Sequence, residues 1–164
     1  MAEKKIWDKW AKENGKHIAL TNKKNWTEEQ FNERGAQDIQ QYVVPFLQEA
    51  WCGQSKKTMV ALDIGCGPGR LTRALHNIFG RVIGIDISSE MVTQAQMMNP
   101  TLEFHTAESV NIPFEEKHFD FVFSFLVFQH FSSKKYTMDT FKEVYRLLKP
   151  GGYALIQLRA IPGR

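Results

Sequence analysis

Residues 61–70 read ALDIGCGPGR, an apolar run that contains an acid and leads into three glycines within five positions. Met59–Ile64 is a short apolar run bounded by turn residues, which is typical of a strand buried on both faces. Apolar residues at helical spacing follow the glycines from Leu71 to Phe79 and predict an amphipathic helix that closes at Gly80. The stretch therefore predicts a strand, a tight glycine turn and a helix.

The same alternation of strand and helix continues along the chain. The further expected strands are Arg81–Ile87, Leu102–His105, Phe119–Phe125 and Tyr153–Leu158, and further helices are expected after Ser88 and after Ser132 or Ser133. Regular alternation implies right-handed crossovers and a sheet covered on both faces. We therefore expect an α/β fold with a doubly wound, mainly parallel, Rossmann-like sheet of five strands. Ligands of such sheets lie beyond the carboxyl ends of the strands. Those ends lead into the loops after Ile64, Asp86, His105 and Ser124.

The segment before this alternation has a helical pattern. Trp7 and Trp10 fall on one side of a first helix, which Gly15 is expected to end. A second helix is predicted after Thr27, where Thr-Glu-Glu-Gln has the form of a capping box. Pro45 lies within the helical period that follows, so we expect a kink or a break there.

Length and composition limit the classes of protein that fit. The chain has 164 residues, of which 43% are hydrophobic and 24% charged, as in one globular domain. We expect an N-terminal helical cap over residues 1–57 and a core domain over residues 58–164. No stretch has the length of a membrane span or the apolar run of a secretory signal, so a cytoplasmic protein is expected.

Charge and cysteine content give two weaker signals. The chain has 21 basic and 18 acidic residues, a net charge of +3. We interpret the lysine-rich opening, Lys4–Lys24, as a solvated face rather than a nucleic-acid-binding arm. Cys52 and Cys66 are too far apart for a metal-knuckle spacing, so we interpret both as reduced thiols and predict no metal site.

The glycine turn points to a ligand with a polar or anionic end. Such a turn brings bare backbone and a helix N-terminus close to a ligand. Gly65, Gly67 and Gly69 give Gly-x-Gly-x-Gly, whereas the pyrophosphate fingerprint of dinucleotide enzymes is Gly-x-Gly-x-x-Gly. A nucleotide-dependent oxidoreductase is therefore a less favoured alternative. A tight turn that binds no ligand is the second alternative.

Two acids narrow the ligand further. Asp63 lies near the end of the first strand, where its carboxylate would repel a pyrophosphate but attract an ammonium group. Asp86 ends the second strand, about 20 residues after Gly65, where a carboxylate can accept hydrogen bonds from both hydroxyls of a ribose. A nucleoside joined to an amino acid satisfies both acids, so S-adenosylmethionine is the expected cofactor.

Four longer motifs extend this pattern in order along the chain: LDIGCGPGRLT, VIGIDIS, FHTAESVNIPFEEKHFDFVFSFLVFQHF and EVYRLLKPGGYALIQ. With them the sequence resembles class I S-adenosylmethionine-dependent methyltransferases over about Met59 to Leu158. The resemblance is greatest to the small-molecule group that includes enzymes of ubiquinone and menaquinone biosynthesis.

The resemblance implies roles for the residues of the turn. The backbone of Gly65, Cys66 and Gly67 would run beside the methionine part of the cofactor. Asp63 would help to place the cofactor's amino group, and Asp86 would hold its ribose.

Adenine recognition is implied with one departure from the family pattern. Ile87 and Met91 would pack against the adenine. Thr106-Ala107 stands where the family usually has Asp-Ala, whose acid accepts from the adenine amino group while the next backbone amide donates to the ring. The Thr106 hydroxyl can still accept a hydrogen bond, and we expect Glu108 to share this role.

The implied reaction is an in-line displacement that moves a methyl group to an oxygen, nitrogen or carbon nucleophile of a small molecule. Ser124 would lie near the methyl donor, and His130 is the candidate general base. No Asp/Asn-Pro-Pro-Tyr motif follows the fourth strand, which argues against amino methylation of nucleic-acid bases. A small molecule is therefore the default acceptor and a nucleic acid is the less favoured one, with protein or RNA acceptors still open. The alternative is a module that binds S-adenosylmethionine without catalysis.

Members of this family usually continue beyond the fifth strand into further strands. The given chain stops at Arg164, so we expect either a truncated product or a short form. In the short form, the fifth strand would be an exposed edge covered by a homodimer partner or by the N-terminal helices.

Overall fold

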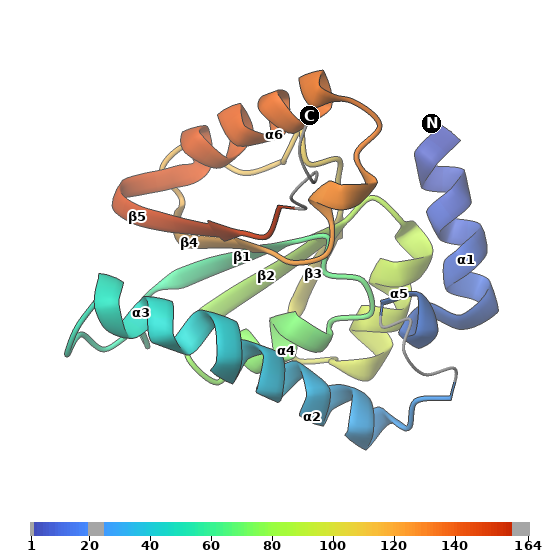
Figure 1. Ribbon diagram of the computed structural model, residues 1–164, viewed down its shortest axis with the longest axis horizontal. Helices are drawn as coiled ribbons and strands as arrows, with labels where there is room; N and C mark the ends of the chain where they lie inside the picture. Colours follow the sequence, from blue (N-terminus) through green and yellow to red (C-terminus); the bar gives the residue numbers. More distant parts are fainter. Residues whose placement is uncertain (1, 20–24, 159–164) are drawn as a thin grey trace, which may run out of the picture.

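The computed structural model describes residues 2–19 and 25–158 (Figure 1). Part of the basic stretch that ends at Lys24, and the last six residues of the predicted core domain, lie outside them. The sheet has five strands in the order β3-β2-β1-β4-β5, all paired in parallel, which confirms the predicted doubly wound α/β sheet. The strands are β1 (Val60–Ile64), β2 (Arg81–Asp86), β3 (Glu103–Thr106), β4 (Phe119–Ser124) and β5 (Leu148–Ile156).

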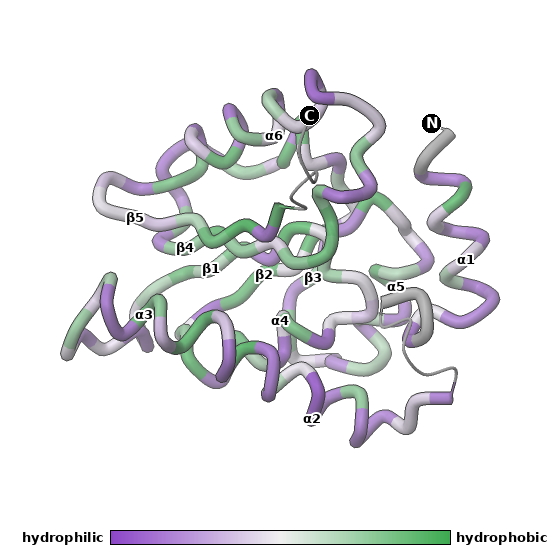
Figure 2. Tube along the Cα trace, in the orientation of Figure 1, coloured by the Kyte–Doolittle hydropathy of each residue, from purple (hydrophilic) through white to green (hydrophobic). Residues whose placement is uncertain are grey.

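Helices cover both faces of the sheet (Figure 1). One face carries α2 (Glu28–Asp38), the π-helical turn Ile39–Val43, α3 (Val44–Ala50), α4 (Arg70–His76) and α5 (Ser89–Met98). The other face carries α6 (Lys134–Leu147), which packs on the strands through Val144 and Leu147. Figure 2 shows hydrophobic residues concentrated on the central strands and hydrophilic residues along α1 and α2.

Strand β4 divides the core into two layers. Phe121 and Phe123 point to the α3 and α4 side, where Phe121 stacks on Phe79 with ring centroids 5.2 Å apart. Val122 points to the α6 side. Strict alternation would place Phe119 beside Phe121, but Phe119 joins the α6 layer because the pairing register shifts between the two residues.

The N-terminal helices follow the sequence signals with one correction. Helix α1 (Ala2–Ala19) does not end at Gly15: it kinks at Asn14, where φ is −171° and ψ is 85°, and the helix then resumes. The Thr27 side chain accepts from the Gln30 amide at 3.2 Å, which confirms the predicted cap. Pro45 lies in the first turn of α3, directly after the π-helical turn, so the predicted interruption is also confirmed.

The second helix is docked closely on the core. A Cβ at Gly35 would lie 2.7 Å from both the Cγ and the carbonyl oxygen of Arg70 in α4, so only glycine lets the two helices approach this far. Asp38, at the end of α2, forms ion pairs with Arg70 and Arg34. The division of the chain at residue 57 stays a prediction.

All five strands differ at one or both ends from the expected ranges: β1, β2 and β4 are each one residue shorter, and β3 and β5 are shifted. Strand β3 begins one residue later than predicted and includes Thr106. Strand β5 begins at Leu148, because α6 ends at Leu147 and Leu148 already has an extended backbone that pairs with Phe119. Strand β5 is the outer strand next to β4 in the described sheet, where a proline is tolerated. Self-association through it stays a prediction.

Three further features of the described residues bear on the sequence predictions. Within the described residues, no helix combines the length and the apolar character needed to cross a membrane. In the same part of the chain, no three His, Cys, Asp or Glu side chains gather as metal ligands would. Cys52 is exposed and Cys66 is buried, and both are free thiols.

Candidate functional site

A cavity of about 690 Å³ opens beyond the carboxyl ends of the strands. Its volume lies in the range of small-molecule sites. The loops after β1, β2, β3 and β4 all contribute to it, as the fold predicts, and α1 and α6 add side chains. The lining residues are Trp7, Trp10, Ile64, Gly65, Cys66, Gly67, Arg70, Leu71, Ile85, Asp86, Ile87, Ala107, Ser109, Phe125, Leu126, Val127, Gln129, His130, Phe131 and Tyr136.

The glycine turn forms the floor of the cavity. Gly65 and Gly67 have φ values of 74° and 53°, a left-handed backbone that side chains disfavour. A Cβ at Gly65 would lie 2.3 Å from Cγ2 of Val127, so the turn also needs the missing side chain for space. The amides of Gly65 and Cys66 both donate to the carbonyl oxygen of Ile85, at 2.8 and 2.9 Å, which ties the turn to β2.

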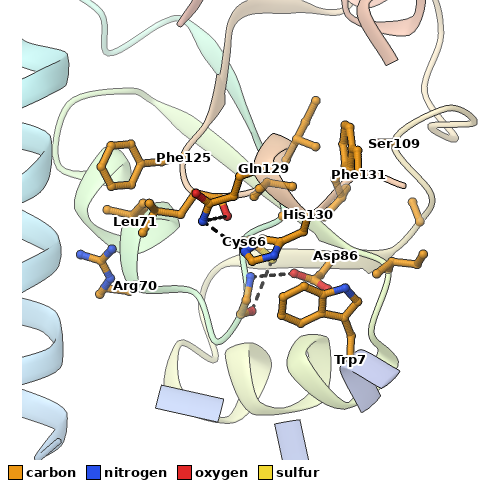
Figure 3. A pocket seen from close by; sticks show the side chains of 18 of the residues that line it. Trp7, Cys66, Arg70, Leu71, Asp86, Ser109, Phe125, Gln129, His130 and Phe131 are labelled. Carbon is orange, nitrogen blue, oxygen red and sulfur yellow. Dashed lines mark hydrogen bonds between the residues drawn. The ribbon is translucent and has the colours of Figure 1, made fainter. Parts of the chain in front are cut away.

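Asp86 is the predicted ribose acid, and it lies at the edge of this turn (Figure 3). Its Oδ2 accepts from the amide of Gly67 and its Oδ1 from the amide of Ser88, both at 2.9 Å. Burial raises the pKa of the carboxyl, although these amides oppose the shift. The two oxygens of a carboxylate have about four acceptor sites, so the group keeps acceptor capacity for a ligand hydroxyl.

Asp63 does not line the cavity. It is 1% exposed and lies beneath the turn, where its Oδ2 accepts from the hydroxyl of Thr72 at 2.7 Å. Burial raises the pKa of Asp63 to about 6, against the stabilising hydrogen bond from Thr72. Asp63 is therefore not placed to contact a cofactor's amino group directly, because its Oδ2 already accepts from Thr72 of α4.

The loop after β3 places its residues differently from the family pattern. Ala107 lines the cavity, but its amide donates to the carbonyl oxygen of Asp86 at 2.9 Å and is not directed at a ligand ring. Thr106 and Glu108 are exposed and lie outside the lining. Ser109, which the sequence reasoning did not select, does line the cavity, and its hydroxyl lies 3.0 Å from that of Thr140.

Of the remaining expected cofactor contacts, one lies in the cavity and two lie behind it. Ile87 is part of the lining. Met91 is 3% exposed and lies on the buried side of α5, near Gly15 of α1. Ser124 is fully buried. Its hydroxyl donates to the carbonyl oxygen of Ile64 at 2.9 Å and so links the ends of β4 and β1.

His130 lines the cavity from a short 3₁₀ turn (Phe128–His130) after β4, and Figure 3 shows it close to Trp7. The ring of Trp7 meets it edge to face with centroids 5.1 Å apart. The side-chain amide nitrogen of Gln129 lies 3.2 Å from His130 Nε2. Partial burial lowers the pKa of His130 below its usual value, so the ring is neutral at neutral pH.

Helix α1 reaches the cavity because polar contacts hold it against α5. Asp8 Oδ1 accepts from the Ser88 hydroxyl at 2.6 Å and from the Glu90 amide at 3.3 Å. Ser88 also caps α5, and its amide donates to Asp86 Oδ1. The contact between Asp8 and Ser88 therefore holds α1 next to Asp86, the residue that ends β2. The side chain of Gln94 adds a bond to the carbonyl oxygen of Ala11 at 2.9 Å.

Sequence reasoning missed most of the aromatic lining. Trp7 and Trp10 were noted only as one side of a helix, and nothing in the sequence tells which surface that side covers. Phe125, Phe131 and Tyr136 follow β4 in a segment where no periodicity separates lining residues from core residues. The signal available was the density of aromatic residues after the fourth strand.

Comparison with known proteins gives one family match. Residues 62–156 match the family described as methyltransferase domain. The chain is 30% identical over 102 residues to tRNA (carboxymethyluridine(34)-5-O)-methyltransferase of Saccharomyces cerevisiae, an alignment that covers 62% of this chain and 36% of that protein. It is 35% identical over 102 residues to demethylmenaquinone methyltransferase of Chlorobaculum parvum, covering 62% of this chain and 41% of that protein.

The fold also has solved counterparts. Phosphoethanolamine N-methyltransferase 1 of Haemonchus contortus, crystallised with phosphoethanolamine and S-adenosylhomocysteine, aligns with a TM-score of 0.72 at 20% identity. The alignment covers 94% of this chain and 31% of that one. The chain thus spans less than half the length of each of these three proteins. Since the family match alone covers more than half of the chain, the chain belongs to the S-adenosylmethionine-dependent methyltransferase family.

Proposed function

We propose that this domain binds S-adenosylmethionine in the cavity and transfers its methyl group to an oxygen, nitrogen or carbon nucleophile of a small molecule. The observation that carries the proposal is Asp86, a half-buried carboxylate beside the glycine turn that lines the cavity and accepts from the amides of Gly67 and Ser88. Such a carboxylate suits the two hydroxyls of a ribose. When bound, the cofactor supplies an activated methyl group, because its sulfur leaves with the electron pair of the broken bond as a neutral thioether.

The lining fits such a cofactor. The turn at Gly65 has no room for a side chain and so presents backbone, which suits the polar methionine part. In the proposed arrangement Cys66 and Gly67 continue this path, while Ile87 and Ala107 flank the adenine. Asp63, Met91, Thr106, Glu108 and Ser124 lie outside the lining, and no direct contact with the cofactor is proposed for them.

The chain's own part in the reaction is to place the nucleophile and to exclude water. Methyl transfer needs the reacting atoms held in a near-attack geometry. The aromatic side of the cavity provides the enclosure, and His130 offers a neutral imidazole that can take the proton of the nucleophile. The amide nitrogen of Gln129 can only donate to His130 Nε2, so Gln129 must turn away before this nitrogen takes the proton.

The test begins with binding and continues with turnover. Calorimetric titration with S-adenosylhomocysteine is expected to show one site, and NAD is expected not to compete. The protein is then incubated with methyl-labelled S-adenosylmethionine and small-molecule fractions, and label is expected in a small product. Absence of S-adenosylhomocysteine binding would contradict the proposal, whereas binding with no transfer to any acceptor would favour the module without catalysis.

A nucleic acid acceptor is the second candidate. The yeast relative is named as a tRNA methyltransferase, and Lys5, Lys9 and Lys12 lie exposed on α1, the helix that also carries Trp7 and Trp10. Label transferred to total tRNA, and lost when these three lysines are changed to alanine, would support it. Label found in small molecules, and unaffected by the same changes, would exclude it.

A further inference from the structure

Leu126, in the loop after β4, has an unfavourable backbone conformation. Its φ is 64°, in the left-handed region that a side chain disfavours. Within the described residues, Lys117 is the other residue besides glycine with a positive φ. Lys117 lies exposed in the turn before β4, whereas Leu126 lines the cavity. Strain of this kind persists only where neighbouring contacts hold it, and it is concentrated at functional sites.

The main contact that holds Leu126 comes from Gln157, which directly follows β5. The side-chain Oε1 of Gln157 accepts from the Leu126 amide at 2.8 Å. The backbone amide of Gln157 donates to the carbonyl oxygen of Ser124 at 2.9 Å, which fixes where its side chain starts. Gln129 adds a longer bond, from its side-chain nitrogen to the Leu126 carbonyl oxygen at 3.3 Å. Both glutamines are exposed, so water competes for these bonds.

The conformation of Leu126 places the next residue, Val127, on the glycine turn. Cγ2 of Val127 lies 2.3 Å from the position that a Cβ of Gly65 would occupy, so the valine fills that space. The carbonyl oxygen of Val127 accepts from the His130 amide at 2.9 Å. The placement of Val127 therefore decides both the cover of Gly65 and the start of the 3₁₀ turn that carries His130.

Packed rings fix the chain on either side of this pair of residues. Phe125 stacks on Phe123 with ring centroids 6.2 Å apart and an interplanar angle of 9°. Phe128 is buried, and its centroid lies 4.6 Å from that of Phe131. The two residues between Phe125 and Phe128 are only half-buried. A movement of the loop is therefore confined to these two residues.

The strain at Leu126 and the bond that opposes it are comparable in size. The left-handed backbone of a residue with a side chain costs about as much as one exposed hydrogen bond contributes. A segment held by two opposed effects of similar size changes its arrangement when either effect is removed. The bond from Gln157 is the effect that a single substitution removes.

We propose that Gln157 is a positioning residue that keeps Leu126 and Val127 closed over the glycine turn, and that release of its hydrogen bond opens this end of the cavity for the cofactor. This rests on the proposed function of the same cavity. In the closed arrangement Val127 covers Gly65 and the His130 amide keeps its acceptor. In the open arrangement Leu126 returns to a backbone region that its side chain favours. Gln157 acts through Leu126, since it lies outside the lining.

The test measures how fast S-adenosylhomocysteine leaves the protein, by stopped-flow tryptophan fluorescence. Gln157→Ala is expected to speed dissociation by several-fold to about tenfold, the effect of one exposed hydrogen bond. Gln157→Glu keeps an acceptor oxygen and is expected to restore the rate to within about twofold of wild type. Gln96→Ala is the matched control, because Gln96 is also exposed and donates to backbone carbonyl oxygens just after α5, outside the lining. Its dissociation rate is expected to match wild type.

A second pair of variants separates the backbone of Leu126 from a general loss of packing. Glycine needs no hydrogen bond to keep a left-handed backbone. In a Leu126→Gly background, Gln157→Ala is therefore expected to change the dissociation rate by less than about twofold. Leu126→Asn replaces the glycine variant if that does not fold, because asparagine tolerates this region. In a Lys117→Gly background, Gln157→Ala is expected to keep its full effect, because Lys117 has the same kind of backbone outside the cavity.

The two proposals fail in distinguishable ways. Failure of the wild type to bind S-adenosylhomocysteine would contradict the proposed function and this inference with it. Binding with an unchanged dissociation rate in Gln157→Ala would overturn this inference alone. Equal acceleration by Gln157→Ala in the Leu126→Gly and Lys117→Gly backgrounds would also overturn it, because the bond would then not serve to hold the backbone of Leu126.

Discussion

The cavity has two walls that are held in different ways. We call Gly65, Gly67 and Asp86 the strand wall, and Trp7 and Trp10 of α1 the helix wall. The strand wall is fixed by backbone hydrogen bonds at the ends of β1 and β2. The helix wall is fixed by side-chain bonds, chiefly those of Asp8. The difference predicts that substitutions in the strand wall abolish cofactor binding, whereas those in the helix wall change how fast the cofactor leaves.

The largest effect is expected for Gly65→Ala in the strand wall. The new Cβ would meet Val127 and would also force a non-glycine residue into a left-handed backbone. S-adenosylhomocysteine affinity is expected to fall more than about 100-fold in calorimetric titration, since a shift of the turn moves several contacts at once. Gly53→Ala is the matched control, because Gly53 has a φ of 69° with nothing within 4 Å of the added atom.

In the control we expect a loss of about 1 kcal/mol in the free energy of unfolding and normal binding. Equal binding losses in the two variants would show that the loss does not arise from the turn at Gly65.

The next effect is expected for Asp86→Ala. It removes the acceptor of the Gly67 and Ser88 amides and the proposed ribose contact. Affinity for S-adenosylhomocysteine is expected to fall about 10- to 100-fold, the cost of one or two charge-assisted hydrogen bonds. Asp139→Ala, on the outer side of α6, is expected to leave affinity unchanged. Wild-type affinity in Asp86→Ala would remove this residue from the site.

A smaller effect is expected for Asp8→Ala in the helix wall. Loss of the bonds to Ser88 and Glu90 loosens α1 over the cavity. We expect S-adenosylhomocysteine to dissociate several-fold faster in stopped-flow fluorescence, with affinity reduced less than about tenfold. Lys9→Ala, on the exposed side of the same helix, is the control. An unchanged dissociation rate would mean that α1 does not limit release.

The smallest effect on binding is expected for Asp63→Asn, which acts on stability. The pKa of Asp63 is about 6 in the folded chain and 3.8 in the reference state, so the folded state binds more protons between these values. Stability of the wild type therefore falls as pH rises from about 4 to 6, by on the order of 3 kcal/mol. The asparagine variant is expected to lose most of this slope in urea denaturation at several pH values, with affinity at pH 7 within about twofold. An unaltered slope would assign the pH dependence to other groups.

The strand wall was largely predictable from the sequence, and the helix wall was not. The glycine spacing and the position of Asp86 are local signals. The glycines directly follow β1 and Asp86 ends β2, so predicting these strands also places the residues at the carboxyl edge of the sheet. The place of Trp7 depends on contacts with residues more than 80 positions away, which no local pattern encodes. Ser124 and Met91 were expected in the site because they lie near strand and helix ends. They point inward instead, because a hydroxyl bond to Ile64 and packing against α1 hold them there.

The strand order has a consequence for how the chain assembles. Strand β1 lies in the middle of the sheet, and it pairs first with β2, which follows about 20 residues later. Its other side stays open until β4 is available, since Ala61 pairs with Phe121. During synthesis, a chain released only as far as β3 has three of the five strands, and one edge of β1 has no partner strand. We therefore expect β1 to depend on late contacts for protection, and fragments that end before β4 to aggregate rather than fold.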